Sequence, residues 1–189
     1  MGFETRALQG GFDDPARQAS FAFRAAMTAM ARPGNVNQIS GGAAPTPCSV
    51  AAASLILTLC DRETPVHLAG IHDTPAMREW ISFHIGAPIV QARDAMFALG
   101  TWDALELTDL PIGTPEYPDQ SATVIVELVE LTQTGARLTG PGIKDQAALN
   151  LPDIAAFQNN HALFPLGLDF YFCAGDRLAA LPRTTQVED

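Results

Sequence analysis

Residues Ala122 to Ile143 read ATVIVELVELTQTGARLTGPGI and contain the most strongly β-forming part of the chain. Residues 122–131 hold three valines, one isoleucine and two leucines, which suits a strand buried on most of both faces. We therefore expect 122–131 to be the central strand of a sheet. Because Gly135 can adopt a positive φ, we expect the chain to fold back there as a hairpin and to place Leu138-Thr139 beside this strand.

The segment Gly140-Pro141-Gly142 should end this pairing, because proline has no N–H to donate and a glycine flanks it on each side. An irregular loop held at the end of a central strand is a common place for functional groups. The same residues would also serve as a tight turn that only leads the chain out of the sheet. The residues alone leave both interpretations open.

Composition limits the class of protein. The chain has 189 residues, of which 47% are hydrophobic and 17% charged, so we expect a single globular domain over 1–189. Its 21 acidic and 11 basic residues disfavour nucleic acid and anionic membrane surfaces as partners. Three widely spaced cysteines and the lack of an apolar run at the N-terminus predict a soluble, cytoplasmic protein. We expect 1–11 and 184–189 to be mobile ends.

Four long helices are predicted, together with a short helix over 101–107. A capping residue followed by proline marks the start of three of them, and the expected spans are 15–31, 48–59, 75–84 and 153–163. In the first helix, Phe23, Met27 and Met30 recur at helical spacing, so we expect them to face the core.

Strands and helices alternate along the chain. Residues 168–173 and 177–181 should form a second hairpin, because the turn between them contains Gly175. Strands that alternate with helices, together with hairpins, indicate an α/β fold in which a mixed β-sheet is flanked by helices.

The sequence contains few signals of chemistry. It has no dinucleotide-binding glycine motif, Walker loop, Gly-x-Ser-x-Gly or His-Glu-x-x-His motif. Lys144 is the only lysine, so an enzyme that needs a Schiff-base lysine would have to use it. The four histidines show no metal-binding spacing. We therefore assign no catalytic residue, no cofactor-binding residue and no metal ligand.

The proline-rich segment 110–119 should be an ordered surface loop that leads into the central strand. Because a rigid loop loses little entropy on docking, its aromatic residue Tyr117 is a candidate for a protein interface. A simple connector is an equally good interpretation of this loop.

Eight blocks of sequence resemble the PhnH family, a subunit of the bacterial carbon-phosphorus lyase core complex. They occur in the order found in the family and cover nearly the whole chain: FDDP (12–15), FRAAM (23–27), MARPG (30–34), LTLCDRETP (57–65), GTPEYPD (113–119), LTGPGI (138–143), PLGLD (165–169) and LPRTT (181–185). Each block is short, but together they are specific.

This resemblance implies a role in organic phosphonate catabolism, as an accessory and non-catalytic subunit. The implied complex is a transferase that forms α-D-ribose 1-methylphosphonate 5-triphosphate from ATP and methylphosphonate. The resemblance further implies a fold similar to the large domain of pyridoxal-phosphate-dependent transferases without the cofactor, a homodimer in isolation, and packing with the G, I and J proteins. It supplies no catalytic residue.

Two site hypotheses follow from the resemblance. In the first, Tyr117 and the loop Gly140-Pro141-Gly142 lie on a surface that docks a partner subunit. In the second, backbone N–H groups near Gly142 and the side chain of Arg32 or Arg183 bind the phosphate group of a ligand. The alternative function is an independent binding protein or enzyme for a small molecule that carries a phosphate or phosphonate.

Overall fold

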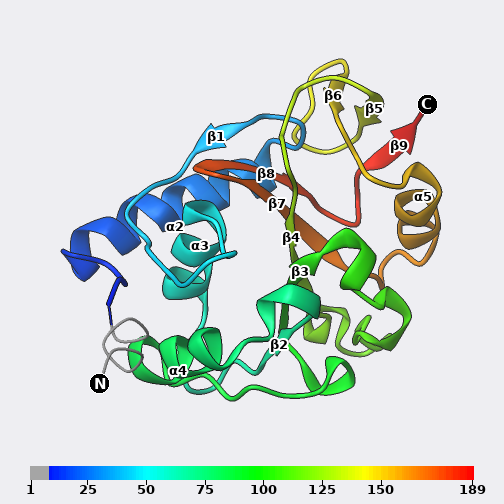
Figure 1. Ribbon diagram of the computed structural model, residues 1–189. Coiled ribbons are helices and arrows are strands. Elements are labelled where there is room, and N and C mark those ends of the chain that lie inside the picture. Colours follow the sequence, from blue (N-terminus) through cyan, green and yellow to red (C-terminus); the bar gives the residue numbers. More distant parts are fainter. Residues whose placement is uncertain (1–8) are drawn as a thin grey trace.

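The structure is a computed structural model that describes residues 9–189; the expected mobile segment 1–11 therefore lies largely outside the described residues. A six-stranded sheet forms its centre, in the order β1-β8-β7-β4-β3-β2 (Figure 1). Strands β2, β3, β4 and β7 run parallel, whereas β8 is antiparallel to both of its neighbours. The strands are β1 Asn37–Gln38, β2 Val66–Leu68, β3 Phe97–Thr101, β4 Thr123–Glu127, β7 Asp169–Ala174 and β8 Arg177–Leu181.

A smaller antiparallel sheet lies beside the first, at the top of Figure 1. It pairs β5 (Ala136–Thr139) with β6 (Ala147–Leu149) on one side and with β9 (Gln186–Glu188) on the other. Its buried residues Leu138 and Val187 join the core on one face of the large sheet.

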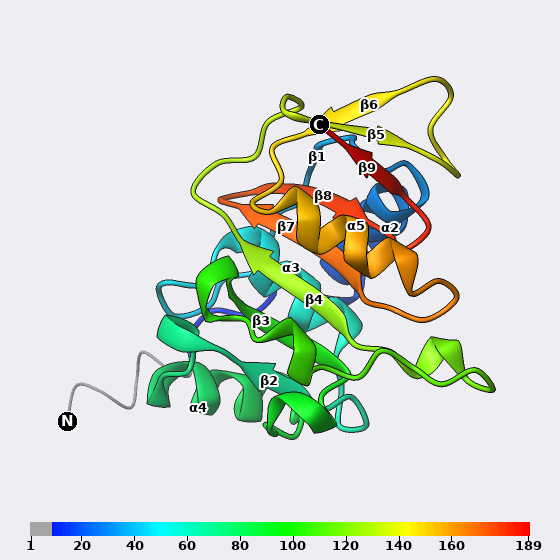
Figure 2. The same ribbon diagram turned by 90° about the vertical axis from the view of Figure 1, so that its right-hand side faces the viewer.

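Helices cover both faces of the large sheet (Figures 1 and 2). Helices α2 (Pro15–Ala31), α3 (Val50–Leu59) and α4 (Pro75–His84) share one hydrophobic core with the sheet, and α5 (Ile154–Ala162) packs into a second core on the other face. Short 3₁₀ turns complete the layers: η1 Gly70–His72, η2 Ala92–Asp94, η3 Trp102–Ala104, η4 Leu107–Asp109 and η5 Pro118–Gln120. The predicted α/β class with a mixed sheet is confirmed.

Strand β4 is central, as the sequence indicates. Ile125 belongs to the core under α2, α3 and α4, whereas Val124 and Val126 belong to the core on the other face. A strand that is apolar on both sides suits this position, because parallel strands in the middle of a sheet are buried on both faces.

The predicted hairpin at Gly135 is wrong. The chain does turn there, with φ of 93° at Gly135, but β5 does not pair with β4. Both edges of β4 are already occupied, by β3 and by β7. The returning segment therefore has no free edge on β4 and pairs with β6 and β9 instead.

The predicted hairpin at Gly175 is confirmed, because β7 and β8 pair across it. The C-terminal residues differ from the mobile tail that we expected, since they form β9. Thr185 is 2% exposed and Val187 is 5% exposed, so this end of the chain is part of the packed structure.

The capping residues start the helices at or near the predicted positions. The side chain of Asp14 accepts from the N–H of Arg17 at the start of α2, and Thr74 accepts from the N–H of Met77 at the start of α4. Helix α3 begins later than expected, because Ser49 caps it by accepting from the N–H of Ala52.

The expected orientation of α2 is wrong for Phe23 and Met27, whereas Met30 is half-buried and packs against the core as expected. Phe23 and Met27 are 50% and 56% exposed, and the buried residues of this helix are its alanines: Ala22, Ala26 and Ala29. The alanine side of α2 faces a run of buried alanines at the start of α3, so small side chains line the contact between the helices.

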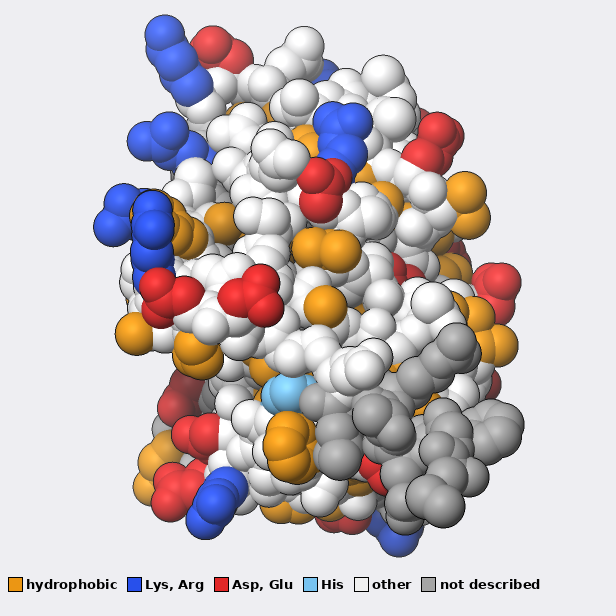
Figure 3. Space-filling model, turned by 60° about the vertical axis from the view of Figure 1, so that its left-hand side comes forward, with side chains coloured by type: hydrophobic (Ala, Val, Ile, Leu, Met, Phe, Trp, Pro, Cys, Tyr) orange, Lys and Arg blue, Asp and Glu red, His pale blue; other side chains and the backbone are white. Residues whose placement is uncertain are grey.

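On the surface of this side of the molecule, apolar side chains stand apart among charged groups (Figure 3). No helix within residues 9–189 is long and apolar enough to span a membrane.

Candidate functional site

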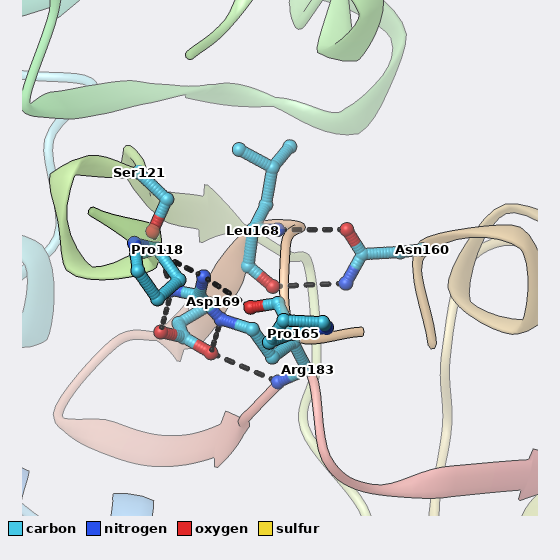
Figure 4. A network of polar contacts seen from close by, with 7 residues as sticks. All are labelled: Pro118, Ser121, Asn160, Pro165, Leu168, Asp169 and Arg183. Carbon is cyan, nitrogen blue, oxygen red and sulfur yellow. Dashed lines mark hydrogen bonds and ion pairs between the residues drawn. The ribbon is translucent and has the colours of Figure 1, made fainter. Parts of the chain in front are cut away.

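Arg183 lies at the edge of the large sheet where β4 and β7 begin. It follows β8, and its backbone N–H donates to Asp169, the first residue of β7, at 2.8 Å. Its side chain forms a two-pronged ion pair with the same carboxylate, with Nε 3.2 Å from Oδ1 and Nη2 2.6 Å from Oδ2 (Figure 4). The side chains of Arg183 and Asp169 are 11% and 26% exposed, so this ion pair is partly shielded from solvent.

The guanidinium also holds two loops. Nη1 donates to the carbonyl oxygen of Pro118 at 2.9 Å and to that of Pro165 at 3.4 Å, and Nη2 donates to the hydroxyl of Ser121 (Figure 4). All three nitrogens of the Arg183 side chain therefore donate to acceptors in the protein. A phosphate group could bind this side chain only by displacing those contacts, so the geometry favours a structural role.

Asn160 on α5 fixes the chain that precedes β7. Its amide nitrogen donates to the carbonyl oxygen of Leu168 at 2.9 Å, and its amide oxygen accepts from the N–H of Leu168 at 2.8 Å (Figure 4). The loop that contains Pro165 is therefore attached both to α5 and to Arg183.

The loop that carries Tyr117 is held from within and from Arg183. The backbones of Thr114 and Tyr117 exchange two hydrogen bonds of 3.1 Å, and Gly113 has a φ of 83° that glycine adopts without strain. Arg183 binds the next residue, Pro118. Tyr117 is 58% exposed, so an ordered loop presents an aromatic residue to solvent.

The loop Gly140-Pro141-Gly142 packs against two distant segments. A Cβ added at Gly140 would lie 3.2 Å from the carbonyl oxygen of Thr184, and one added at Gly142 would clash with the carbonyl oxygen of Ala31. Both glycines have positive φ, and Ile143 closes the turn by donating to the Gly140 carbonyl at 3.1 Å. The loop therefore needs glycine at both positions for close approach.

These contacts connect the residues that the sequence singles out. Gly142 lies against the end of α2 next to Arg32, Gly140 lies against the residue that follows Arg183, and Arg183 holds the loop of Tyr117. We use the name docking surface for two candidate patches: Tyr117 on one, and Arg32 with Gly140-Pro141-Gly142 on the other. All of these residues except the half-buried Gly140 are exposed, and the segment of Arg183 and Thr184 links the two patches. Arg183 lies beneath it as a support.

Electrostatics at Arg32 are mixed. Its guanidinium is exposed, but Arg32 is the C-cap of α2, where the unpaired carbonyl groups carry partial negative charge. That partial charge opposes an anion next to Gly142. The geometry therefore favours the interface hypothesis over the phosphate-binding hypothesis.

Tyr171 connects β7 to α2. Burial raises the pKa of Tyr171 to about 12, and the charge of Asp169 acts in the same direction. The phenol therefore stays protonated and donates to the carbonyl oxygen of Ala26 at 3.3 Å. This hydrogen bond fixes α2, and with it Arg32, against the strand that carries Asp169.

Two residues of this network were missed in the sequence. Asp169 and Ser121 have no distinctive spacing from Arg183, being 14 and 62 residues away. Asp169 lies in the block PLGLD and Arg183 in the block LPRTT, both of which resemble the family. The position of both residues in such blocks was the one feature of the sequence that could have indicated them. Among residues 9–189, no three His, Cys, Asp or Glu side chains could hold a metal ion together.

Comparison with known proteins shows what the chain is similar to. Residues 10–188 match the family described as bacterial phosphonate metabolism protein (PhnH). A protein of Rhizobium meliloti (strain 1021), named alpha-D-ribose 1-methylphosphonate 5-triphosphate synthase subunit PhnH, is 36% identical over 200 residues, which cover 100% of this chain and 99% of the relative. HtxG of Stutzerimonas stutzeri, whose name refers to a C-P lyase subunit, is 29% identical over 172 residues, which cover 88% of this chain and 84% of the relative.

A match of this length includes every strand of the large sheet, the Arg183 network and the docking surface. The chain belongs to the PhnH family of bacterial phosphonate metabolism proteins.

Proposed function

We propose that the chain is an accessory, non-catalytic subunit of a bacterial carbon-phosphorus lyase complex, and that it supports formation of α-D-ribose 1-methylphosphonate 5-triphosphate from ATP and methylphosphonate. The observation that carries this proposal is the relative of Rhizobium meliloti, which is named as a subunit of that synthase and matches this chain from end to end. In this proposal the protein acts in the cytoplasm, forms a homodimer when alone, and packs with the G, I and J subunits.

The site supports a docking role. The guanidinium of Arg183 is occupied by protein acceptors, whereas Tyr117 and Arg32 are exposed on ordered segments. Aromatic and arginine side chains dominate the binding energy of many interfaces, and a fixed loop loses little conformational entropy when it docks. We therefore assign the contact with a partner subunit to the docking surface.

The proposal includes a relation in fold to the large domain of pyridoxal-phosphate-dependent transferases. The mixed sheet with helices on both faces is compatible with that relation. A Schiff base with the cofactor needs a lysine, and Lys144, the only one, is exposed in the loop between β5 and β6. The proposed role therefore assigns no pyridoxal phosphate chemistry to this chain.

Co-expression tests the proposal. A tagged form of the chain would be produced together with the G, I and J proteins of the same source, and the purified material would be measured by light scattering. The proposal predicts one stoichiometric assembly that contains all four proteins. A dimer of this chain that leaves the other three proteins unbound would contradict it, and would favour the alternative of an independent phosphonate- or phosphate-binding protein.

A further inference from the structure

The opposite edge of the large sheet holds a second group of polar side chains. Glu127 is the last residue of β4, and His72 lies on the turn η1 that follows β2, so both lie at the edge where the parallel strands end. The side chains are 10% and 1% exposed, and Nε2 of His72 lies 3.9 Å from Oε1 of Glu127. This separation is longer than a hydrogen bond.

His72 is unusual because it is buried without a hydrogen bond. Neither Nδ1 nor Nε2 has a partner among the described residues. Buried polar atoms are nearly always paired, because an unpaired donor or acceptor loses its bonds to water and gains nothing in return. The imidazole therefore needs a partner, and the carboxylate of Glu127 is within reach of a small movement.

Glu127 is fixed at its end of this pair. Its Oε1 accepts from the backbone N–H of Ser49 at 2.7 Å, at the start of α3. The movement that brings His72 and Glu127 together must therefore come from η1. This short turn holds His72 by few hydrogen bonds, one of which runs from the N–H of His72 to the carbonyl oxygen of Ala69 at 3.2 Å.

We propose that His72 and Glu127 form a proton-linked latch, in which one proton shared between Nε2 and the carboxyl group holds the turn η1 against the end of β4. In the closed form the protonated carboxyl group donates its O–H to the neutral imidazole. This contact would pair Nε2 of His72, and it needs His72 to approach Glu127 by about 1 Å, to an ordinary hydrogen-bond length.

The surroundings favour this protonation state. Burial lowers the pKa of His72 and raises the pKa of Glu127, so both groups tend toward their neutral forms. Burial raises the pKa of two nearby thiols, Cys48 in the segment before α3 and Cys173 on β7, and the charge of Glu127 raises both further, so the thiols stay uncharged. Beside η1, the carboxylate of Asp73 is paired with Arg78.

The sign of the pH dependence follows from these directions. Because the pKa of Glu127 is raised, the stability that its protonated carboxyl group contributes to the folded protein is present below pH 4.5 and is lost as the pH rises through the raised pKa. Because the pKa of His72 is lowered, the stability that its neutral imidazole contributes to the folded protein is present above pH 6.5 and is lost as the pH falls through the lowered pKa. In the closed form Nε2 is the acceptor, so the neutral imidazole carries its proton on Nδ1. Release of the proton from Glu127 then leaves two acceptors facing each other and opens the latch on the alkaline side.

Hydrogen exchange at η1 tests the latch in the intact chain. The protection factors of the amides of His72 and Asp73 would be measured against pH, after correction for the intrinsic exchange rate. We expect protection to fall by up to about tenfold per pH unit as Glu127 loses its proton. The variant Glu127→Gln should remove this slope, whereas Glu130→Gln, which changes an exposed acid on the same segment, should keep it. Equal slopes in the native protein and in Glu127→Gln would overturn the latch.

A second measurement needs no variant. The ring nitrogens of His72 would be followed by nuclear magnetic resonance across the same pH range. The latch predicts that the imidazole stays neutral through pH 6.5 and that Nε2 shifts when Glu127 titrates. An imidazole that takes up a proton near pH 6.5, with no second inflection, would overturn the proposal even where Glu127→Gln fails to fold.

Discussion

Arg183 and Asp169 form a two-pronged ion pair across the edge of the sheet, with Nη2 2.6 Å from Oδ2, and the backbone N–H of Arg183 adds a third bond to the same carboxylate at 2.8 Å. The pair joins the chain after β8 to the first residue of β7. Since the same guanidinium holds the loop before β4, this relationship fixes the position of Tyr117 relative to the sheet.

Breaking the Arg183 pair should destabilise the fold. We expect Arg183→Ala to lower the free energy of unfolding by about 2–4 kcal/mol, because Asp169 would be left without its cation and two loops without their donor. Arg183→Lys should recover only part of this loss, since an ammonium group cannot reproduce the two-pronged contact. Urea denaturation at pH 7 measures both effects.

The control for this prediction is Arg93→Ala. Arg93 pairs with Asp94 at 3.7 Å, but its side chain is 79% exposed. Exposed ion pairs contribute little to stability, so this variant should change the free energy of unfolding by less than about 0.5 kcal/mol. Equal losses in Arg183→Ala and Arg93→Ala would show that the Arg183 network does not support the fold.

Close approach of the Gly142 loop to α2 gives a second prediction. Gly142→Ala should be strongly destabilising, because its φ is 82° and the added Cβ would clash with the carbonyl oxygen of Ala31. Gly175→Ala is the matched control: its φ is 60°, and no atom lies within 4 Å of the added Cβ.

Both alanine variants carry the backbone strain of a positive φ, about 1–2 kcal/mol, and only Gly142→Ala adds the clash. Thermal unfolding should therefore place the midpoint of Gly142→Ala several degrees below that of Gly175→Ala. If the two midpoints coincide, the loop does not pack against α2 as described.

The C-terminal strand gives a third prediction. Val187 is 5% exposed in β9, so Val187→Asp would bury a charge and should lower the free energy of unfolding by at least about 2 kcal/mol. Gln186→Ser changes an exposed residue of the same strand and should be nearly neutral. Circular dichroism during thermal unfolding compares the two variants, and equal midpoints would support the mobile tail instead.

The sequence predicted correctly those helix caps and turns whose contacts lie within a few residues of the chain. Asp14 and Thr74 cap helices at the expected positions, because a capping side chain accepts its hydrogen bond from an N–H only three residues further along the chain. The turn at Gly175 likewise joins two strands that are neighbours in sequence and in space. These predictions needed no knowledge of the rest of the fold.

Two predictions that depend on distant partners failed. Gly135 makes its turn, but the partner of β5 is decided by β3 and β7, which occupy both edges of β4. Phe23 and Met27 repeat at helical spacing, yet the alanines of α2 are buried because they allow close approach to α3. The contact between Asp169 and Arg183 is of the same kind, since it depends on how β7 and β8 meet the loop before β4.

The docking surface should tolerate a change at Tyr117 without loss of fold. Because the ring is 58% exposed, Tyr117→Ala should leave the thermal midpoint within a few degrees of the native value. Gly142→Asp is unsuitable as an interface variant, because the clash with Ala31 would disturb the fold itself. Arg32→Glu changes an exposed side chain next to the same loop and is the better partner for Tyr117→Ala.

The most direct measurement of the central claim compares three forms of the chain during co-purification with the G, I and J proteins. The forms are the native protein, the double variant Tyr117→Ala with Arg32→Glu, and Phe83→Ala, which removes an aromatic ring that is 62% exposed on α4, outside the docking surface. We predict that the native protein and Phe83→Ala assemble alike, and that the double variant binds at least about tenfold more weakly while its thermal midpoint falls by no more than a few degrees, because Glu at the C-cap of α2 meets the partial negative charge of the helix end. Assembly of the double variant at the native affinity would contradict the assignment of the docking surface.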